Sequence, residues 1–391
     1  MTRVRPGIEV LFARETRRVR GKRLGVLAHP ASVAPGLEHL VDLLPREPSV
    51  TVAAIFGPEH GYRGEAQDME GVAGAAEGSV PVFSLYGRDR ASLVPPPSSL
   101  DGVDLFLVDL QDVGARYYTF TATMAYCMQA CAARGIPVLV LDRPNPIGGE
   151  AIEGPVLEEG FESFVGPFAI PVRHGMTIGE LARLFNDRYG IGCDLGVIPM
   201  EGWERRMHFE DTGLPWILPS PNMPTPDTAR VYPGTCLIEA TNVSEGRGTT
   251  RPFEFAGAPW IDPDRLAARL RETSPPGVAF RPCFFRPTFQ KHQGLRCGGV
   301  QLHVTDRSAF EPFQAGLALI QAFLTLRPDE FRWREKPYEF ETDRPAFDLL
   351  AGNGWLRERL AAGEPPAALR EAWAVDLAAF AELRKEFLLY P

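Results

Sequence analysis

The stretch VDLFLVDLQDVGARYYTF, residues 103–120, decides the fold, because a mostly apolar run ends abruptly in polar, glycine-containing sequence. Similar apolar runs occur as RLGVLA at 23–28, VTVAAIF at 50–56, VPVFSL at 80–85 and IPVLVL at 136–141. Nearly continuous apolar runs are typical of parallel strands that are covered on both faces. Apolar residues at helical spacing lie between them, at 36–44 and 119–134. This alternation predicts an α/β domain with a Rossmann-like parallel sheet over residues 1–150.

Residues 151–391 alternate less regularly and predict a second, smaller α+β domain. Helices are expected at 177–189, 263–272, 306–326 and through the tail at 345–390, and strands near 195–200 and 299–305. Neither an internal repeat nor a low-complexity linker separates the two halves. We therefore expect a fixed interface between the domains, with an active-site cleft along it.

The charge balance limits the partners of the protein. There are 41 Lys and Arg residues against 50 Asp and Glu residues, a net charge of -9, which disfavours nucleic acid and anionic membranes. The six cysteines form no CxxC pair, so we expect buried thiols and no zinc or redox motif. The basic N-terminal residues lack the apolar run of a signal peptide. The sequence as written therefore predicts a cytoplasmic protein, and export would require a different start site.

Glycine and proline are abundant, at 38 and 37 of 391 residues, and they gather in polar loops that follow the predicted strands. The carboxyl ends of parallel strands meet at one edge of a sheet, where ligands bind in open α/β folds. No strand is followed by GxGxxG or GxxxxGK[ST], so we expect no dinucleotide, and no other cofactor is indicated. The composition predicts a cleft lined by several stiff loops.

The first of these loops is GPEHGYRG, residues 57–64. A carboxyl group in a partly desolvated crevice at a strand end can serve as a general acid, which makes Glu59 a candidate catalytic residue and His60 and Arg63 candidate binding residues. The structural alternative is an ion pair between Glu59 and Arg63 that braces the loop.

Three further loops carry candidate site residues. Carboxylates, arginines and aromatic rings are the groups that bind sugars and their acidic substituents. After the strands at 103–110 and 136–141 the candidates are Asp109, Asp112, Arg116, Tyr117, Tyr118, Asp142, Arg143 and Asn145. In the long polar loop at 233–255 they are Glu239, Asn242, Glu245, Arg247, Thr249 and Arg251. Internal ion pairs and rigid turns are the structural alternatives for these residues.

Other catalytic classes fit poorly, because the chain has no GxSxG, no HExxH and only scattered histidines. We expect no metal site. A metal-dependent hydrolase that uses His60 with Asp109 or Asp112 is kept as an alternative.

Several long motifs resemble one known family. They are GPEHGYRG, DLQDVGARYYTF, DRPNPIGG, EGP, PSPNMPT (in which Asn222 is a candidate substrate-binding residue), YPGTCLIEATNVSEGRGTTRPFE, FRPTFQKHQGLRCGGVQLHVTDR and the closing FLLYP. Together they resemble the NamZ-type exo-β-N-acetylmuramidases, long known only as a domain of unknown function, over residues 7–391.

The resemblance implies hydrolysis of β-linked N-acetylmuramic acid (MurNAc) from the non-reducing end of peptidoglycan fragments, in a cleft between a Rossmann-like domain and a smaller one. It implies Glu59 as the catalytic glutamate, and a muropeptide or a saccharide of MurNAc and N-acetylglucosamine (GlcNAc) as the small-molecule partner. A glycosidase also needs a second group, for which Asp109, Asp112, Glu239, Glu245 and the substrate's own acetamido oxygen are open. The lactyl carboxylate of the sugar calls for arginine, and the candidates are Arg63, Arg116, Arg143, Arg247 and Arg251. A non-catalytic muropeptide-binding protein is the other alternative.

Overall fold

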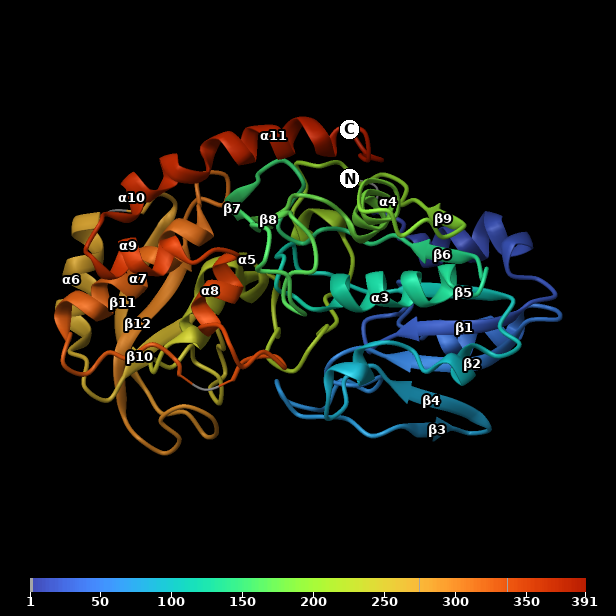
Figure 1. Cartoon of the computed structure of the whole chain (residues 1–391), viewed down its shortest axis with the longest axis horizontal. Helices are drawn as coiled ribbons and strands as arrows, with labels where there is room; N and C mark the ends of the chain where they lie inside the picture. Colours follow the sequence, from blue (N-terminus) through green and yellow to red (C-terminus); the bar gives the residue numbers. More distant parts are fainter. Residues whose placement is uncertain (1–2, 274, 336) are drawn as a thin grey trace.

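The computed structural model describes residues 3–273, 275–335 and 337–391. Its largest sheet has seven strands in the order β3-β4-β2-β1-β5-β6-β9, all parallel to their neighbours except β3, which is antiparallel to β4. The strands are β1 (Arg23–Ala28), β2 (Thr51–Gly57), β3 (Ala75–Glu77), β4 (Val80–Ser84), β5 (Leu105–Asp109), β6 (Val138–Leu141) and β9 (Leu195–Ile198). Figure 1 shows this sheet on the right, in blue to green. The predicted Rossmann-like domain is confirmed.

Successive residues of the central strands point into two different cores. In β5, Leu105 and Leu107 belong to the core on one face of the sheet, and Phe106 and Val108 belong to the core on the other face. The first core also contains residues of the short helices α1 (Gly7–Val10) and α2 (Leu40–Leu43), and the second contains residues of α3 (Phe120–Ala132) and α4 (Ile178–Arg188). Both faces are therefore covered, which is why these strands are apolar throughout.

The strand order places a topological switch point at β1. From β1 the chain proceeds to β2 and β4 on one side of the sheet, and then returns to build β5, β6 and β9 on the other side. In sheets of this kind the crevice at the carboxyl ends, between the strands on either side of the switch, is the usual ligand site. The loops after β2 and β5 meet there.

The second domain is built on a three-stranded antiparallel sheet in the order β10-β12-β11, with β10 (Phe255–Ala258), β11 (Val278–Phe285) and β12 (Cys297–Val304). A two-stranded antiparallel sheet is formed by β7 (Glu153–Val156) and β8 (Pro171–Arg173). The helices are α5 (Pro226–Thr235), α6 (Pro263–Thr273), α7 (Pro312–Leu326), α8 (Ala346–Ala351), α9 (Trp355–Ala361), α10 (Pro366–Leu369) and α11 (Ala374–Arg384). Figure 1 shows this domain on the left.

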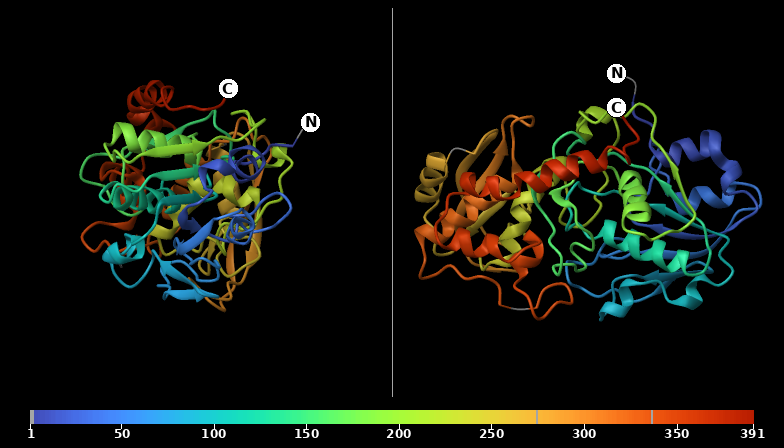
Figure 2. Two further views of the ribbon diagram at one scale, coloured as in Figure 1. Left: turned by 90° about the vertical axis from the view of Figure 1, so that its right-hand side faces the viewer. Right: turned by 45° about the horizontal axis from the view of Figure 1, so that its top comes forward.

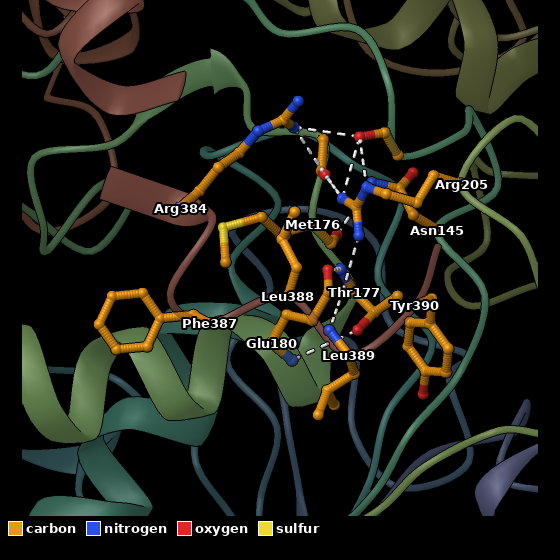
Figure 3. A network of polar contacts seen from close by, with 12 residues as sticks. Asn145, Met176, Thr177, Glu180, Arg205, Arg384, Phe387, Leu388, Leu389 and Tyr390 are labelled. Carbon is orange, nitrogen blue, oxygen red and sulfur yellow. Dashed lines mark hydrogen bonds and ion pairs between the residues drawn. The ribbon is translucent and has the colours of Figure 1, made fainter. Parts of the chain in front are cut away.

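The last residues of the chain return to the first domain. Helix α11 crosses from the second domain towards the first, as the right-hand view of Figure 2 shows. Beyond it, the Leu389 amide donates to Glu180 Oε1 at 2.8 Å, and the Tyr390 hydroxyl donates to Asp142 Oδ2 at 2.5 Å. Figure 3 shows Glu180 between Leu389 and Arg205. The Nη1 atom of Arg205 lies 2.7 Å from Glu180 Oε1, the oxygen that also accepts from Leu389. We call residues 387–391 the C-terminal strap, because they tie the two domains together.

The structure corrects two expectations about segment boundaries. The strand near 195–200 was expected in the second domain, but β9 pairs with β6, so the first sheet extends past residue 150. Residues 217–255 were expected as one long loop, but they contain α5, whose start is set by Thr225 as N-cap and Pro226 as first residue. Within the described ranges, no helix is both long and apolar enough to cross a membrane.

Candidate active site

The loop after β2 holds Glu59 in an unusual turn. Gly57 lies so close to the Tyr62 main chain that a side chain there would collide with it. The next residues turn sharply, and His60 adopts a left-handed conformation with φ of 71° while its Nδ1 lies 2.9 Å from the Ala66 carbonyl oxygen. Left-handed backbone in a non-glycine residue is costly and is concentrated at functional sites. This turn leaves Glu59 only 6% exposed.

The loop after β5 reaches Glu59 from the other side of β1. Thr119, directly before α3, donates its hydroxyl to Glu59 Oε2 at 2.6 Å. The neighbouring Tyr117 and Tyr118 are buried, and the Tyr117 hydroxyl donates to the Pro233 carbonyl in the second domain. The two loops therefore meet at the switch point, as the positions of their strands require.

The second domain supplies a wall of charged groups. Arg247 Nη1 lies 2.7 Å from Glu239 Oε1, and the Tyr338 hydroxyl donates to Glu239 Oε2 at 2.8 Å. Arg247 Nε also lies 3.4 Å from Asp68 Oδ1, on a loop of the first domain. Both oxygens of Glu239 are thus held, and the wall is joined electrostatically to the first domain.

These groups line a pocket that opens to solvent, which we call the Glu59 pocket. Seven of the expected site residues line it: Glu59, His60, Tyr117, Tyr118, Asn222, Glu239 and Arg247. Both domains contribute to this lining, so the expected cleft between them is present.

Further residues line the pocket that the sequence did not single out. They are Asp68, Thr119, Val165, Ser220, Met223, Tyr232, Phe253, Tyr338 and Glu339. Ser220 lies in the PSPNMPT motif and Phe253 lies in the long polar loop, so the sequence identified their segments but not these residues. Tyr338 and Glu339 follow no strand and lie in no glycine-rich loop, so no local signal identified them.

Glu339 is a second glutamate in the lining with an altered acidity. Its Oε2 accepts the Tyr86 hydroxyl at 2.8 Å, and its backbone has a positive φ of 47°. Burial, together with the nearby Glu59 carboxyl, raises the pKa of Glu339 well above its ordinary value. Glu339 therefore holds its proton more tightly than an ordinary glutamate does, which eases the repulsion from a second carboxyl beside it.

Glu245, expected as catalytic, lies behind the wall instead. It is 1% exposed, with Oε2 at 2.8 Å from Lys291 Nζ and Oε1 at 3.1 Å from Arg247 Nη1. Burial opposes ionisation of this carboxyl, but Lys291 and Arg247 outweigh it and lower the pKa of Glu245 to about 2. Glu245 is therefore an ionised brace for Arg247, and it does not line the pocket.

The other expected residues lie outside the Glu59 pocket because each is engaged elsewhere. The buried ones have these partners: Asp109 pairs with Arg143, Asp112 faces His174 and caps Gly114, Asp142 accepts from Thr177 and Gly179, and Asn145 bonds to Met176 and Ile147. The more peripheral ones have these: Arg63 pairs with Glu77, Arg251 with Glu254, Asn242 bonds to Glu330, and Thr249 to Gly246. Internal ion pairs and turns thus account for these residues, but the expected brace between Glu59 and Arg63 was wrong, because Arg63 pairs with Glu77 and Glu59 with Thr119.

Arg116 shows how a buried arginine can look like a binding residue in sequence. It is 1% exposed, and its guanidinium donates to the carbonyl oxygens of Pro155, Ile170 and Leu350 at 2.7–2.9 Å. Burial lowers the pKa of Arg116 to about 10. Its donors join three segments of the fold, and it does not reach the pocket.

The metal alternative finds little support in the geometry. His60 lines the Glu59 pocket, but Asp112 Oδ2 lies 3.3 Å from His174 Nε2 and accepts the Gly114 amide at 2.7 Å. In the described part of the chain, no three His, Cys, Asp or Glu side chains are grouped closely enough to hold a metal ion.

Comparison with known proteins gives matches over the whole chain. The curated "Peptidoglycan beta-N-acetylmuramidase NamZ" of Bacillus subtilis (strain 168) is 47% identical over 390 residues, which cover 99% of this chain and 92% of that protein. Two crystal structures of proteins from Bacteroides fragilis NCTC 9343, described as members of the DUF1343 family, match 100% of this chain. One has a TM-score of 0.89 and 34% identity over 100% of its own chain, and the other a TM-score of 0.77 and 31% identity over 99%.

Two family models also match, and their boundary agrees with the position of β9. The models described as "Exo-beta-N-acetylmuramidase NamZ, N-terminal" and "C-terminal" match residues 24–227 and 230–390, so the first unit runs well beyond residue 150. These two matches span almost the whole chain, and the full-length relative is well above 30% identical. The chain therefore belongs to the NamZ family of exo-β-N-acetylmuramidases.

Proposed function

We propose that this protein is an exo-β-N-acetylmuramidase that releases β-linked MurNAc from the non-reducing end of peptidoglycan fragments, with Glu59 as general acid. Membership of the NamZ family and the full-length match to a peptidoglycan β-N-acetylmuramidase support the activity. The observation that carries the assignment of the acid is the position of Glu59. It lies on the wall of a pocket between two domains, at the switch point of the sheet, with one carboxyl oxygen held by Thr119.

The reaction needs two groups on opposite sides of the scissile bond. Glu59 gives a proton to the glycosidic oxygen as the bond from that oxygen to the anomeric carbon breaks. A water molecule supplies the hydroxyl that ends on the anomeric carbon, and its proton passes to a base. We assign the second role to Glu239. Of the four carboxylates left open, Asp109, Asp112, Glu239 and Glu245, it is Glu239 that lines the Glu59 pocket. Arg247 and Tyr338 hold its two oxygens in place.

The lactyl group of MurNAc distinguishes it from GlcNAc and provides the handle for selectivity. Arg247 is the one arginine among the five expected that lines the Glu59 pocket, as far as the described residues show. Arg247 Nη1 forms ion pairs with both Glu239 and Glu245. The guanidinium group carries further N–H donors besides those on Nη1. We assign recognition of the lactyl carboxylate to these remaining donors of Arg247.

The decisive experiment is product analysis by mass spectrometry with two defined disaccharides. The protein should split MurNAc-β-1,4-GlcNAc into its two sugars and leave GlcNAc-β-1,4-MurNAc intact, because the second has no MurNAc at its non-reducing end. Binding of the first disaccharide without release of sugar would indicate a binding protein instead. Cleavage that stops on addition of a chelator would favour the metal-dependent alternative.

Selectivity for the lactyl group is tested separately with chromogenic substrates. A β-N-acetylmuramide should be hydrolysed far faster than the matching β-N-acetylglucosaminide. Equal rates would contradict the role of Arg247 and leave the glycosidase assignment standing.

A further inference from the structure

A second cavity, of about 430 Å³, lies apart from the Glu59 pocket and shares no lining residue with it. First-domain residues around Gly148 and His208 and second-domain residues around Arg307 and Arg370 line it, together with Glu153 and Arg173 from the small sheet. We call this cavity the junction pocket. Nothing in the proposed hydrolysis uses it.

Three buried side chains of the junction pocket have polar atoms without a hydrogen-bond partner among the described residues. Arg173 is 6% exposed, and its Nη2 donates to the Ile147 carbonyl at 2.6 Å, but its Nε has no partner. His208, 8% exposed, has an unpartnered Nδ1, and Glu153, also 8% exposed, has an unpartnered Oε2. Buried polar groups are almost always satisfied, so three of them around one cavity indicate a bound group that is polar.

The charges around His208 indicate the sign of that group. Burial lowers the pKa of His208 to about 4, and the nearby guanidinium groups of Arg230, Arg173 and Arg307 add to this effect. The imidazole is therefore neutral at pH 7. Arg173 and Arg307 line the pocket with this neutral histidine, whereas Arg230 lies outside the lining and is paired with Glu210 and Asp227 at 2.5 Å. A site with this field favours an anion.

The acidic residues of the pocket do not cancel this field. Glu311 forms an ion pair with Arg370, in which Oε1 lies 2.6 Å from Nη2. Arg307 Nη2 is paired with Asp211 Oδ1 at 3.0 Å. Each of these guanidinium groups keeps further N–H donors after one such contact. Burial raises the pKa of Glu153 to about 7, so much of this carboxyl is protonated near neutral pH and can itself donate a hydrogen bond.

We propose that the junction pocket binds an oxyanion, the phosphate or carboxylate group of a small molecule, between Arg173 and Arg307. Its oxygens accept from Arg173 Nε and from the free N–H groups of Arg307. His208 and Glu153 line the same pocket and supply further polar contacts to this group. Arg173, on β8, lies in the part of the chain matched by the N-terminal family model, and Arg307 lies in the part matched by the C-terminal one, so the ligand bridges the junction between these two units.

The test is isothermal titration calorimetry of the full chain at pH 7 with inorganic phosphate and, separately, with citrate. We expect saturable binding of at least one of the two, and the preferred probe identifies the class as phosphoryl or carboxylate compounds. Arg307→Ala should weaken that binding at least tenfold, since it removes half of the proposed cationic pair. The side chain is 44% exposed, so we expect this variant to fold. Arg173→Gln should do the same, and Arg307→Ala decides the result if Arg173→Gln does not fold.

A matched control is Arg269→Ala, in which the lost arginine has similar exposure and is paired with Glu272 on α6, outside the pocket. It should bind the probe as the wild type does. Saturable binding of neither probe, or binding that Arg307→Ala leaves unchanged, would overturn the proposal. Hydrolysis of a chromogenic β-N-acetylmuramide by Arg307→Ala should stay at the wild-type rate, which separates this site from the Glu59 pocket.

Discussion

Thr119 donates its hydroxyl to Glu59 Oε2 at 2.6 Å, and this bond joins the loop after β2 to the loop after β5. The two strands lie on either side of β1, so the bond spans the switch point of the sheet. No other described residue forms a hydrogen bond with this carboxyl, so Thr119 alone orients it. The acid assigned to the reaction is thus positioned by a residue from a different βα unit.

Glu59→Gln should abolish most hydrolysis of a chromogenic β-N-acetylmuramide. Glutamine has the same shape but cannot supply an acidic proton, and loss of a general acid costs about 10²–10⁴-fold in rate. Steady-state kinetics measure the loss, and circular dichroism shows whether the fold is kept. Glu65→Gln, on the exposed part of the same loop, should retain wild-type turnover. Equal turnover in Glu59→Gln and Glu65→Gln would refute the assignment.

Thr119→Val should lower kcat by up to about tenfold, with little change in KM. The reactive acid is a neutral carboxyl group, and a hydrogen bond between neutral groups contributes about 0.5–1.5 kcal/mol, of which about 1.4 kcal/mol corresponds to a tenfold change in rate. Thr119→Ser keeps the hydroxyl and should recover most of the activity. A positioning role would be contradicted if the valine and serine variants were equally slow.

The first domain could be predicted from the sequence because its strands are buried on both faces. Residues of β5 supply two cores in alternation, so the whole strand is apolar and stands out from its surroundings. Because the carboxyl ends of parallel strands share one edge of the sheet, the loops after these strands were expected to meet there. This placed Glu59 in the predicted cleft. Four strands after residue 150 were missed. β7, β8 and β10 are only three or four residues long, and β7 and β10 contain glycine. β11 is eight residues long, but Arg281 and Pro282 interrupt its apolar pattern.

The site was predicted less completely, because polar residues next to strand ends have two possible uses. Asp109 and Arg143 occupy such positions, yet they pair with each other at 2.5 Å in the interior. Tyr338 and Glu339 reach the Glu59 pocket from a segment some 280 residues further along the chain. Whether a side chain faces a ligand or a distant carbonyl depends on tertiary contacts that local sequence does not encode.

Arg116→Met should destabilise the protein and leave the chemistry of the folded enzyme intact. The substitution leaves three buried carbonyl oxygens, including that of Leu350, without their donor, at a cost of about 1–3 kcal/mol each. Chemical denaturation should show a loss of about 3 kcal/mol or more, while KM is unchanged. Arg116→Lys should recover only part of the loss, because one ammonium group cannot reach three carbonyls as a planar guanidinium does. An increase in KM with unchanged stability would restore Arg116 as a substrate ligand.

Tyr390→Phe should weaken the C-terminal strap. The Tyr390 hydroxyl donates to Asp142 and accepts the Met200 amide at 2.9 Å, so its loss removes two hydrogen bonds, one of them to a carboxyl group. We expect a loss of about 2 kcal/mol in the free energy of unfolding. Tyr189→Phe is the matched control, since its hydroxyl has a single carbonyl partner, that of Ala169, and its loss should cost about 1 kcal/mol. Equal stabilities of the two variants would contradict a special role for the strap.

Glu153→Gln should change how stability depends on pH. Burial raises the pKa of Glu153 from 4.5 to about 7, so the native state holds this proton more tightly than the unfolded chain does. The resulting stabilisation is complete below about pH 4.5 and is lost as the pH rises to about 7. Glutamine keeps an oxygen for the Gln314 amide and does not titrate, so the variant should gain relative to the wild type between pH 5 and pH 8, by up to about 3 kcal/mol. Urea denaturation at both pH values measures the difference. Parallel pH profiles for the two proteins would show that Glu153 ionises in the native state as readily as in the unfolded chain, because only a difference in proton affinity between the two states produces a pH-dependent free energy.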